Sequence, residues 1–489
     1  MSDKTVIGID IGTTAIKAVL VTGAGTQLGH YVESYPTARP APGIVEQEPD
    51  DWIRVAIQAL AGFERDFDLG GLQAIGICSQ ANTHVFIDRN ATPLAPAIVW
   101  QDLRCADIAA ELDGQVGAES RIAWWGAPLP IDASHCLSRM EWMRRNRPDI
   151  WGRSRAVILP KDYCIARLTG EVAADAIASI GLVDGQLNYI KALLDLVPDA
   201  VQRLPPLRDF THVVGRVLPG LPCAGTPVIV GTMDAWSGMF GVDVGKVGSA
   251  MYLSGTSDVL GIVSPKRVPT PGVAAFPTYQ EITLHAAPIQ SGGASLAWLS
   301  RLLGRSIDEL CVLAAAMSGQ ERIPLFIPHL DGERAPLWDP FARGIFLGLD
   351  SSMGPAHLVR SVMEGVAYSA QWALETLERS ADSSPSILNC GGGGFASDVW
   401  NQIRADVLGR TLRCVRSADA AATGAAAMAL AGIGAAGSIA DAASRIVQFE
   451  REFRPDPARR GYHEVRMALL KDSYAATQDI SRRHVTSVL

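Results

Sequence analysis

Asp10 is a carboxylate that stands inside an apolar run, Val6 to Ile11, and such a residue needs a partner. A buried charge is costly unless a cation, hydrogen-bond donors or water molecules compensate it. Lys17 follows on the next apolar segment, so one interpretation is a structural ion pair between the two side chains. The other is that Asp10 holds hydrated Mg²⁺ beside a phosphate group. The residue types alone leave both interpretations open.

A short turn after Asp10 suits a phosphate group. Residues 12–14 read Gly-Thr-Thr and the apolar pattern resumes at Ala15, which predicts a strand, a tight turn and a second strand. Consecutive turn amides form an anion-binding concavity, and glycine permits close approach to the backbone. A second Gly-Thr turn lies between apolar segments, and Gly12 and Gly255 are 243 residues apart. Two such turns predict two related lobes that each bind phosphate.

Asp234 follows a predicted strand at 227–230 and a break at Gly231. It is therefore expected to open a helix at the carboxyl end of a strand, where open α/β sheets bind ligands. Aspartate is a good helix cap, and the residues by themselves favour that interpretation. The functional alternative is a general base that accepts a proton from a substrate hydroxyl as its oxygen attacks a terminal phosphate.

Residues 391–394 are four glycines that follow a predicted strand at 387–390. They match the dinucleotide-binding pattern G-x-G-x-x-A only loosely and lie late in the chain. The run is either a tight strand-to-helix turn or a shelf without side chains for an adenine ring. The chain has no GxxxxGK[ST] pattern, so a P-loop enzyme is not supported.

Polar and aromatic side chains follow two more apolar runs, at residues 79–84 (SQANTH) and 100–104 (WQDLR). Amides and carboxylates hydrogen-bond to sugar hydroxyls, and an indole packs on the carbon face of a sugar. These segments are candidates for a sugar site, with ordinary loop polarity as the alternative.

Alternating strand and helix patterns indicate an α/β protein. The predicted strands are 6–11, 15–21, 74–78, 97–100, 227–230, 249–253, 259–263 and 387–390. The predicted helices are 51–60, 137–145, 357–378 and 397–408, with further helix from Asp441 onward. A chain of 489 residues with 48% hydrophobic residues can form two large domains. We place their boundary near Val244, which gives lobes at 1–244 and 245–489.

Composition excludes several classes of partner and compartment. The net charge of −8 argues against a nucleic-acid binder, which needs clustered lysine and arginine. Residues 420–440 lack charge but are mostly alanine and glycine, so a packed helix pair is expected in place of a membrane span. Asp3 and Lys4 lead directly into a strand, which predicts a cytoplasmic protein without a signal peptide. Eight cysteines without a CxxC pair predict reduced, mostly buried thiols and no zinc site.

Several longer motifs make the chain resemble the FGGY carbohydrate kinases over essentially its full length. The most specific is GIFLGL at 344–349, followed after seven residues by HLVRSVMEG at 357–365, which fits the family's second signature at every fixed position. Family-like blocks also lie at 332–340 and at 160–163 together with 168–171. The first signature, at 134–146, departs from the family pattern because Arg139 replaces the usual lysine and Cys136 a small residue.

The resemblance implies an α/β fold of two actin-like, ribonuclease H-like lobes, with ATP and a sugar in the cleft between them. It implies that Asp234 is the catalytic base and that Asp10 binds Mg²⁺. The residues expected at ATP and its phosphates are Gly12, Thr13, Thr14, Lys17, Gly255, Thr256, Gly392, Gly393, Gly394 and Ser397. The residues expected at the sugar are Gln80, Asn82, Trp100, Asp102 and Asp234. Such kinases are commonly homodimers, and no sequence feature decides the oligomeric state here.

Within the family, the block IVWQDLR at 98–104 resembles the xylulokinases. Two departures fall on expected sugar contacts. Ala81 and Asn82 stand where xylulokinases usually have Met-His, and Ala235 follows the base where an amide residue is frequent. The leading activity is phosphorylation of D-xylulose to D-xylulose 5-phosphate, and ribulose, erythritol or glycerol are alternative substrates.

Two other classes of function are weighed against a kinase. A non-catalytic sugar-sensing relative would keep the fold, but the joint presence of Asp10, both Gly-Thr turns and Asp234 argues against it. An actin-like filament protein or chaperone-type ATPase would share the phosphate-binding hairpins. It would lack the blocks at 332–334 and 344–364.

Overall fold

The computed structural model of the chain describes residues 4–127, 129–268, 270–317, 321–417 and 419–487, so Asp3 lies outside the described residues. Contacts between Cα atoms divide the chain into two compact units. The first comprises 1–245, 277–280 and 419–447, and the second comprises 246–276, 281–418 and 448–489. The expected halves, 1–244 and 245–489, therefore need a correction. The second unit is not a continuous segment, because residues 277–280 and 419–447 belong to the first unit.

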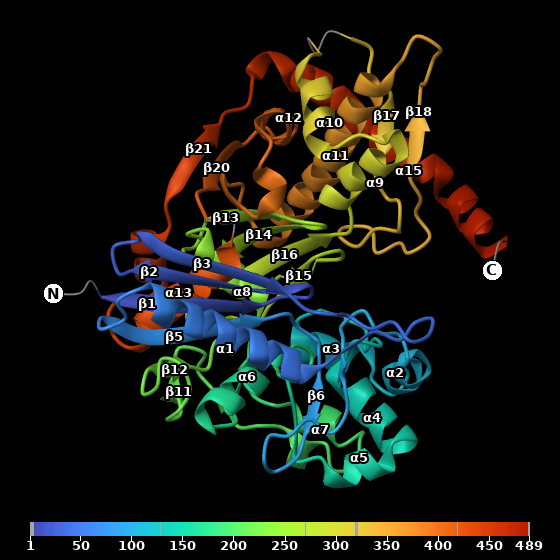
Figure 1. Ribbon diagram of the computed structural model, residues 1–489. Helices are drawn as coiled ribbons and strands as arrows, with labels where there is room; N and C mark the ends of the chain where they lie inside the picture. The colour runs from blue at the N-terminus through green and yellow to red at the C-terminus, as the bar shows by residue number, and fades with distance from the viewer. Residues whose placement is uncertain (1–3, 128, 269, 318–320, 418, 488–489) are drawn as a thin grey trace. The chain divides into compact units, whose positions relative to one another are not determined.

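The first unit contains a six-stranded sheet with the order β11-β12-β5-β1-β2-β3 (Figure 1). Its strands are β1 (Thr5–Ile11), β2 (Ala15–Thr22), β3 (Gln27–Ser34), β5 (Leu72–Ser79), β11 (Val213–Arg216) and β12 (Pro227–Ile229). The predicted hairpin after Asp10 is confirmed, since β1 and β2 pair antiparallel. Strand β5 pairs parallel to both β1 and β12. The carboxyl ends of β1, β5 and β12 thus lie at one edge of the sheet.

Different helices cover the two faces of β1 (Figure 1). Ile7, Ile9 and Ile11 share a core with the apolar face of α1 (Pro49–Asp66). The alternate residues face α13 (Ala420–Gly432), because side chains on a strand alternate between its faces. Gly8 pairs with Gly76 of β5, and a Cβ atom on Gly8 would lie 1.9 Å from the carbonyl oxygen of Ala422. Small residues on both sides let this helix approach the sheet at backbone distance.

The same helix packs closely on α8 (Asp234–Gly241). A Cβ atom on Gly424 would lie 1.7 Å from the carbonyl oxygen of Ser237, and one on Gly241 would lie 1.7 Å from that of Ala420. The Ser237 hydroxyl donates to the carbonyl of Ala421 at 2.6 Å. The charge-free alanine and glycine run is therefore a helix packed inside the first unit, as the sequence predicted. Among the described residues, no helix is long and apolar enough to cross a membrane.

The rest of the first unit consists of short strands and helices, several of which pack around a second apolar core that includes Leu137 and Met140. These elements are β4 (Glu46–Gln47), β6 (Val85–Ile87), β7 (Ala97–Ile98), α2 (Ala106–Asp113), α3 (Ala118–Trp125), α4 (Cys136–Asn146), α5 (Pro148–Arg153), β8 (Ala156–Ile158), α6 (Pro160–Thr169), β9 (Ala174–Asp175), α7 (Lys191–Leu194), β10 (Leu207–Arg208) and α14 (Ile439–Ile446).

The second unit contains a seven-stranded sheet with the order β15-β16-β14-β13-β19-β20-β21. Its strands are β13 (Ala250–Ser254), β14 (Asp258–Ser264), β15 (Ala274–Ala275), β16 (Thr283–Ile289), β19 (Ile387–Gly391), β20 (Thr411–Val415) and β21 (Phe449–Phe453). A two-stranded sheet pairs β17 (Leu325–Ile327) with β18 (Ile345–Leu347). The predicted hairpin around Gly255 is confirmed, because β13 and β14 pair antiparallel.

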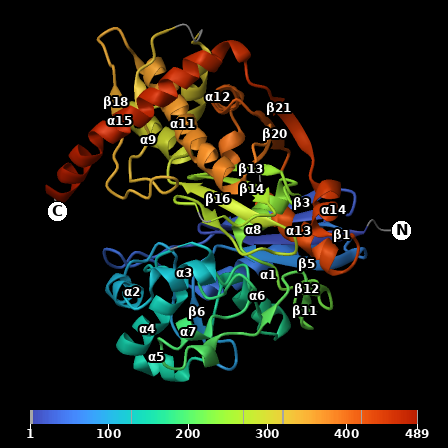
Figure 2. The ribbon, with the colours of Figure 1, turned by 180° about the vertical axis from the view of Figure 1, so that it is seen from behind.

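Helices pack on this second sheet and on one another (Figure 2). They are α9 (Gly293–Leu303), α10 (Ile307–Ala315), α11 (Pro355–Ala381), α12 (Asp398–Leu408) and α15 (Arg460–Ser487). The expectation of continuous helix from Asp441 is wrong, because β21 interrupts it and adds an edge strand beside β20. All eight cysteines are free, and all are buried except the half-buried Cys311.

Candidate active site

Asp10 lies near the carboxyl end of β1 and is 9% exposed. Lys17 is its register partner on β2, but the Lys17 ammonium lies 3.2 Å from Asp419 at the start of α13. The polar contact of the Asp10 carboxylate is the Cys78 thiol, whose Sγ atom lies 3.5 Å away. No described lysine, arginine or histidine lies within ion-pair distance of Asp10. The structural Asp10–Lys17 pair considered from the sequence is therefore not formed.

The pKa of the buried Asp10 carboxyl is well above its ordinary value. Burial first, and then the nearby Asp234 carboxylate, raise the pKa of Asp10 to about 7, while Lys17 opposes the shift. A carboxylate in this state is poorly compensated by protein groups and would gain from a bound cation. Magnesium is often held by one or two carboxylates together with substrate phosphates, so Asp10 fits a Mg²⁺ ligand. The described residues contain no group of three or more acidic, histidine or cysteine ligands.

Asp234 is the first residue of α8, and Met233 is the N-cap. The Asp234 carboxylate accepts a hydrogen bond from the backbone amide of Ala235 at 2.8 Å. Burial raises its pKa to about 6, and the backbone donors partly oppose that shift. Asp234 therefore does not cap α8 in the N-cap position, and its half-buried carboxylate is available to a substrate hydroxyl.

A buried ion cluster fixes the segment that precedes Asp234. The Thr232 hydroxyl donates to Asp175 at 2.7 Å. The Lys161 ammonium lies 2.9 Å from the other oxygen of Asp175 and 2.6 Å from Asp162. All four side chains are buried, and paired buried charges of this kind resist rearrangement. Side chains from α6 and β9 therefore hold the segment between β12 and Asp234 in place.

Hydrogen bonds connect three expected site residues: Gln47 lies between Gln80 and Thr13, and Trp100 bonds directly to Thr13. The Gln80 amide donates to Gln47 at 2.9 Å, and Gln47 donates to the carbonyl of Thr13 at 2.7 Å. The Trp100 indole donates to the Thr13 hydroxyl at 3.0 Å. The structure thus brings the first phosphate turn together with two expected sugar contacts. Gln80 is 1% exposed, and its Oε1 atom has no hydrogen-bond partner among the described residues.

Asn82 has a left-handed backbone with φ of +53° and donates to Ser134 at 3.3 Å. Arg139 of α4 holds the two strand-end loops together. Its fully buried guanidinium donates to the carbonyls of Ile98 at 2.7 Å and Val99 at 2.6 Å, and also to that of Asn82. The residue that departs from the family's first signature therefore supports the backbone of both expected sugar-binding segments.

Asp102 is fully buried, and both of its oxygens are occupied. They accept from the amide of Val45 at 2.6 Å and from the guanidinium of Arg104 at 2.9 and 2.7 Å. This arrangement favours an anchoring role for Asp102 in the loop that presents Trp100. It offers no free oxygen to a sugar.

The second unit brings its two expected nucleotide segments together. Gly255 and Thr256 are exposed in the β13–β14 turn, and the amides at the start of α9 donate to their carbonyls at 3.0 and 2.9 Å. Gly392 has φ of +98° and continues into a short 3₁₀ turn, Gly393–Phe395. Ser397 is the N-cap of α12 and accepts from the amide of Trp400 at 3.4 Å.

Comparison with known proteins decides the family. Residues 5–241 match the N-terminal domain of the FGGY family of carbohydrate kinases, and residues 250–433 match its C-terminal domain. The chain belongs to the FGGY family of carbohydrate kinases. It is a sugar kinase with ATP as co-substrate, and not the filament protein or chaperone-type ATPase considered from the sequence.

The relatives of this FGGY kinase are named after different substrates. The xylulose kinase of Escherichia coli (strain K12) is 30% identical over 417 residues, covering 83% of this chain and 85% of the relative. The gluconokinase of Bacillus subtilis (strain 168) is 26% identical over 426 residues, covering 82% of each. The crystal structure of the xylulose kinase from Rhodospirillum rubrum matches with a TM-score of 0.86 and 26% identity, covering 98% of this chain and 99% of that one. The expected actin-like α/β fold is confirmed.

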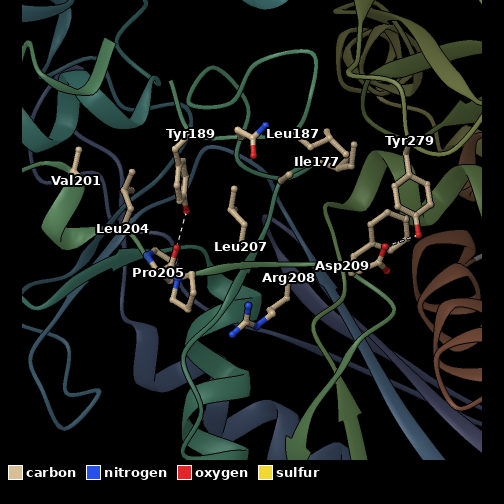
Figure 3. Close-up of a pocket in the computed structure, with 14 residues that line it drawn as sticks. Ile177, Leu187, Tyr189, Val201, Leu204, Pro205, Leu207, Arg208, Asp209 and Tyr279 are labelled. Carbon is tan, nitrogen blue, oxygen red and sulfur yellow. Dashed lines mark hydrogen bonds between the residues drawn. The ribbon is translucent and has the colours of Figure 1, made fainter. Parts of the chain in front are cut away.

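One cavity of this FGGY kinase lies away from the expected site residues. It has a volume of about 720 Å³ and lies in the first unit (Figure 3). Tyr189, Leu207 and Tyr279 are among its lining residues, and the Tyr279 hydroxyl donates to Asp209 at 2.9 Å. None of the residues expected at ATP or the sugar lines it.

Sequence reasoning missed three residues of this FGGY site. Gln47 lies on a two-residue strand, which leaves no periodic signal. Asp419 precedes the alanine-rich helix and pairs with Lys17 from about 400 positions away in the chain. Arg139 was noted only as a departure from a motif. A lone arginine at the apolar face of a predicted helix is the one signal that could have marked it.

Proposed function

We propose that the chain is a kinase of a ketopentose, foremost D-xylulose, and that Asp234 is its catalytic base. The observation that carries the proposal is the half-buried Asp234 carboxylate at the start of α8, with a pKa raised to about 6. A general base works best with a pKa near the operating pH. Two xylulose kinases, from Escherichia coli and Rhodospirillum rubrum, support the choice of sugar.

In the proposed reaction, Asp234 accepts the proton of one sugar hydroxyl as its oxygen bonds to the γ-phosphorus of ATP. The bond from that phosphorus to the β,γ-bridging oxygen breaks, and ADP leaves with the electron pair. Phosphoryl transfer depends mainly on positioning and charge stabilisation. Mg²⁺ held at Asp10 would neutralise phosphate charge. The Gly12, Thr13 and Thr14 turn supplies amide and hydroxyl donors.

On the sugar side, we propose that Gln80, Asn82 and Trp100 contact the substrate, with Asp102 holding the Trp100 loop in place. On the nucleotide side, we propose the second Gly-Thr turn for the phosphates and the glycines at 392–394 with Ser397 for adenosine. These roles follow from the family resemblance. The hydrogen bonds among Gln80, Gln47, Thr13 and Trp100 support the first group, because they connect sugar and phosphate segments within one unit.

A substrate panel tests the choice of sugar. ADP release is measured with D-xylulose, D- and L-ribulose, erythritol, glycerol and gluconate, and NMR of the product locates the phosphate. We expect the highest kcat/KM with D-xylulose and phosphorylation at its 5-hydroxyl. A higher kcat/KM with any other member would replace D-xylulose as the proposed substrate.

Replacement of Asp234 tests the base. We expect Asp234→Asn to lower kcat by about 10²- to 10⁴-fold, the usual contribution of a general base, with little change in ATP affinity. Asp195→Asn is the matched control, because Asp195 is an exposed acid of the same unit that pairs with Lys191. Full turnover by the Asp234→Asn protein would remove Asp234 from the role.

A further inference from the structure

Arg404 of α12 is a fully buried arginine in the second unit that is not part of the expected site. Three aromatic rings surround its guanidinium, at 4.1 Å from the ring centre of Trp400, 4.7 Å from that of Phe395 and 5.4 Å from that of Tyr252. A charge this deep in the protein is retained only where hydrogen bonds and counter-charge compensate it. The hydrogen-bond partners of Arg404 therefore show which segments of the chain it connects.

Arg404 donates to both nucleotide segments. One terminal nitrogen donates to the carbonyl of Gly394 at 2.7 Å, and the other donates to the Ser254 hydroxyl at 3.0 Å. Gly394 belongs to the glycine run expected at adenosine. Ser254 is the last residue of β13 and directly precedes the Gly-Thr turn expected at the phosphates. The fork of a guanidinium is rigid, so two such bonds fix the distance between the two segments.

An acidic residue, Asp258, also takes part in the connection between Arg404 and the Gly-Thr turn. Asp258 is the first residue of β14, on the other side of the turn, and is fully buried. It accepts from the Ser254 hydroxyl at 2.7 Å and from the Tyr252 hydroxyl at 2.6 Å, and it lies 4.0 Å from Arg404. Ser254 thus accepts from the arginine and donates to the acid, so both ends of the turn are tied to α12.

The two backbones already touch at this point. A Cβ atom on Gly394 would lie 2.0 Å from the Ser254 hydroxyl oxygen, and one on Gly392 would lie 2.4 Å from the Ser254 carbonyl. The two hydrogen bonds from the buried Arg404 guanidinium add a directional constraint to this close packing.

We propose that Arg404 is a positioning residue for the nucleotide: it sets the spacing between the adenosine-binding glycines and the phosphate-binding Gly-Thr turn, so that one ATP molecule can contact both. The proposal rests on the proposed function for the identity of these two segments. ATP behaves here as a ligand with two ends, and its affinity exceeds that of either end only when the spacing of the two subsites matches its length. Arg404 itself does not touch the nucleotide.

The variants Arg404→Met and Arg404→Lys test this. Methionine keeps much of the buried volume, and lysine keeps the charge but loses the fork. We expect the KM for ATP to rise about tenfold to a hundredfold, as the loss of one or two charged hydrogen bonds implies, with the KM for the sugar within about twofold. The inhibition constants of adenosine alone and of tripolyphosphate alone should change by less than about threefold, because each occupies one segment.

Ser254→Ala provides an independent variant if Arg404 replacements lower the folded fraction, which circular dichroism measures. It should raise the KM for ATP in the same direction, and the double variant with Arg404→Met should be less than additive because the two groups share one link. Arg410→Met is the matched control. Arg410 is a half-buried arginine of the same unit that pairs with Glu378 at 2.7 Å and contacts neither segment.

Two outcomes would overturn the proposal. One is a folded Arg404 variant whose KM for ATP equals that of the unmodified protein. The other is an equal loss of affinity for ATP, adenosine and tripolyphosphate, which would show damage to each segment and not to their spacing. Failure of the proposed nucleotide role of the two segments is distinguishable, because the unmodified protein would then show no ATP binding in calorimetry. The Arg404 proposal would fall with that role, whereas a different sugar substrate would leave it intact.

Discussion

Two acidic residues of the first unit differ in what surrounds them, and that difference suggests different tasks. Asp10 is buried beside a thiol, and none of the described cationic side chains lies within ion-pair distance of it, whereas Asp234 receives an amide hydrogen bond at the start of a helix. Burial raises both pKa values, to about 7 and about 6 respectively. The buried Asp10 carboxylate would gain from a bound cation, and a carboxyl with a pKa near 6 is largely ionised at neutral pH and can accept a proton there.

The pH dependence of turnover follows from Asp234. A base accepts a proton only when it is ionised, so activity is present above its pKa and lost as the pH falls through about 6. We expect log kcat/KM for the sugar, measured at saturating Mg²⁺ and ATP, to bend downward near pH 6. A flat profile between pH 5 and 8 would contradict the assignment.

Asp10 should reduce stability in a pH-dependent way. Its pKa is raised from 3.8 to about 7 on folding, so the folded state binds more protons and the unfolding free energy falls as the pH rises through that window. In metal-free buffer, Asp10→Asn should therefore increase the unfolding free energy at pH 8 by up to about 4 kcal/mol, and by less as the pH approaches 5. Urea denaturation at several pH values measures this. Equal stability of the two proteins at pH 8 would contradict the prediction.

At the scale of elements, α13 is the central one of the first unit. It contacts β1, β5 and α8, and glycines at each contact allow the backbones to approach. Because Asp10 lies on β1 and Asp234 begins α8, the small residues of α13 set where both carboxylates stand. The alanines and glycines of this helix thus determine how closely its backbone approaches β1, β5 and α8.

Two helix-interior glycines should respond oppositely to alanine. At Gly424 of α13 a Cβ atom would lie 1.7 Å from the carbonyl of Ser237, so Gly424→Ala should lower the unfolding free energy by about 1–3 kcal/mol or more. At Gly62 of α1 the nearest atom is a ring carbon of Tyr31 at 4.0 Å, so Gly62→Ala should raise it by about 0.5–1 kcal/mol. Thermal melts compare the pair. A stabilised Gly424→Ala protein would show that α13 does not pack as described.

At the scale of the whole molecule, the chain does not form two consecutive halves. It completes the first unit only after most of the second, when residues 419–447 return to it. Long-range closure of this kind makes the folding of the first unit depend on a segment from the far end of the chain.

A fragment test follows. Residues 1–245 alone should not unfold cooperatively on heating, because Gly8 and Gly76 would expose a backbone face that α13 normally covers. A fusion of 1–245 to 419–447 through a flexible linker should restore a cooperative transition. Circular dichroism measures both. A cooperative melt of the shorter fragment would contradict the discontinuous unit.

Local patterns in the sequence were sufficient for most elements and for the family. Apolar runs broken by Gly-Thr predicted both hairpins, and the GIFLGL and HLVRSVMEG motifs indicated the FGGY kinases, which the comparison confirms. These features depend on neighbours in the chain. The strand at 449–453 was missed because it is short, with three charged residues between two phenylalanines, and because its pairing with β20 is a tertiary contact.

What only the tertiary structure decided is which charged and polar groups meet. Lys17 is opposite Asp10 in register yet pairs with Asp419, and Asp102 is satisfied by Val45 and Arg104. Arg404 reaches a serine 150 positions away. The free energy of such contacts depends on burial and on distances of a few tenths of an ångström. The sequence by itself therefore determined the kind of enzyme, and the packing of the chain decided which side chains hold its site.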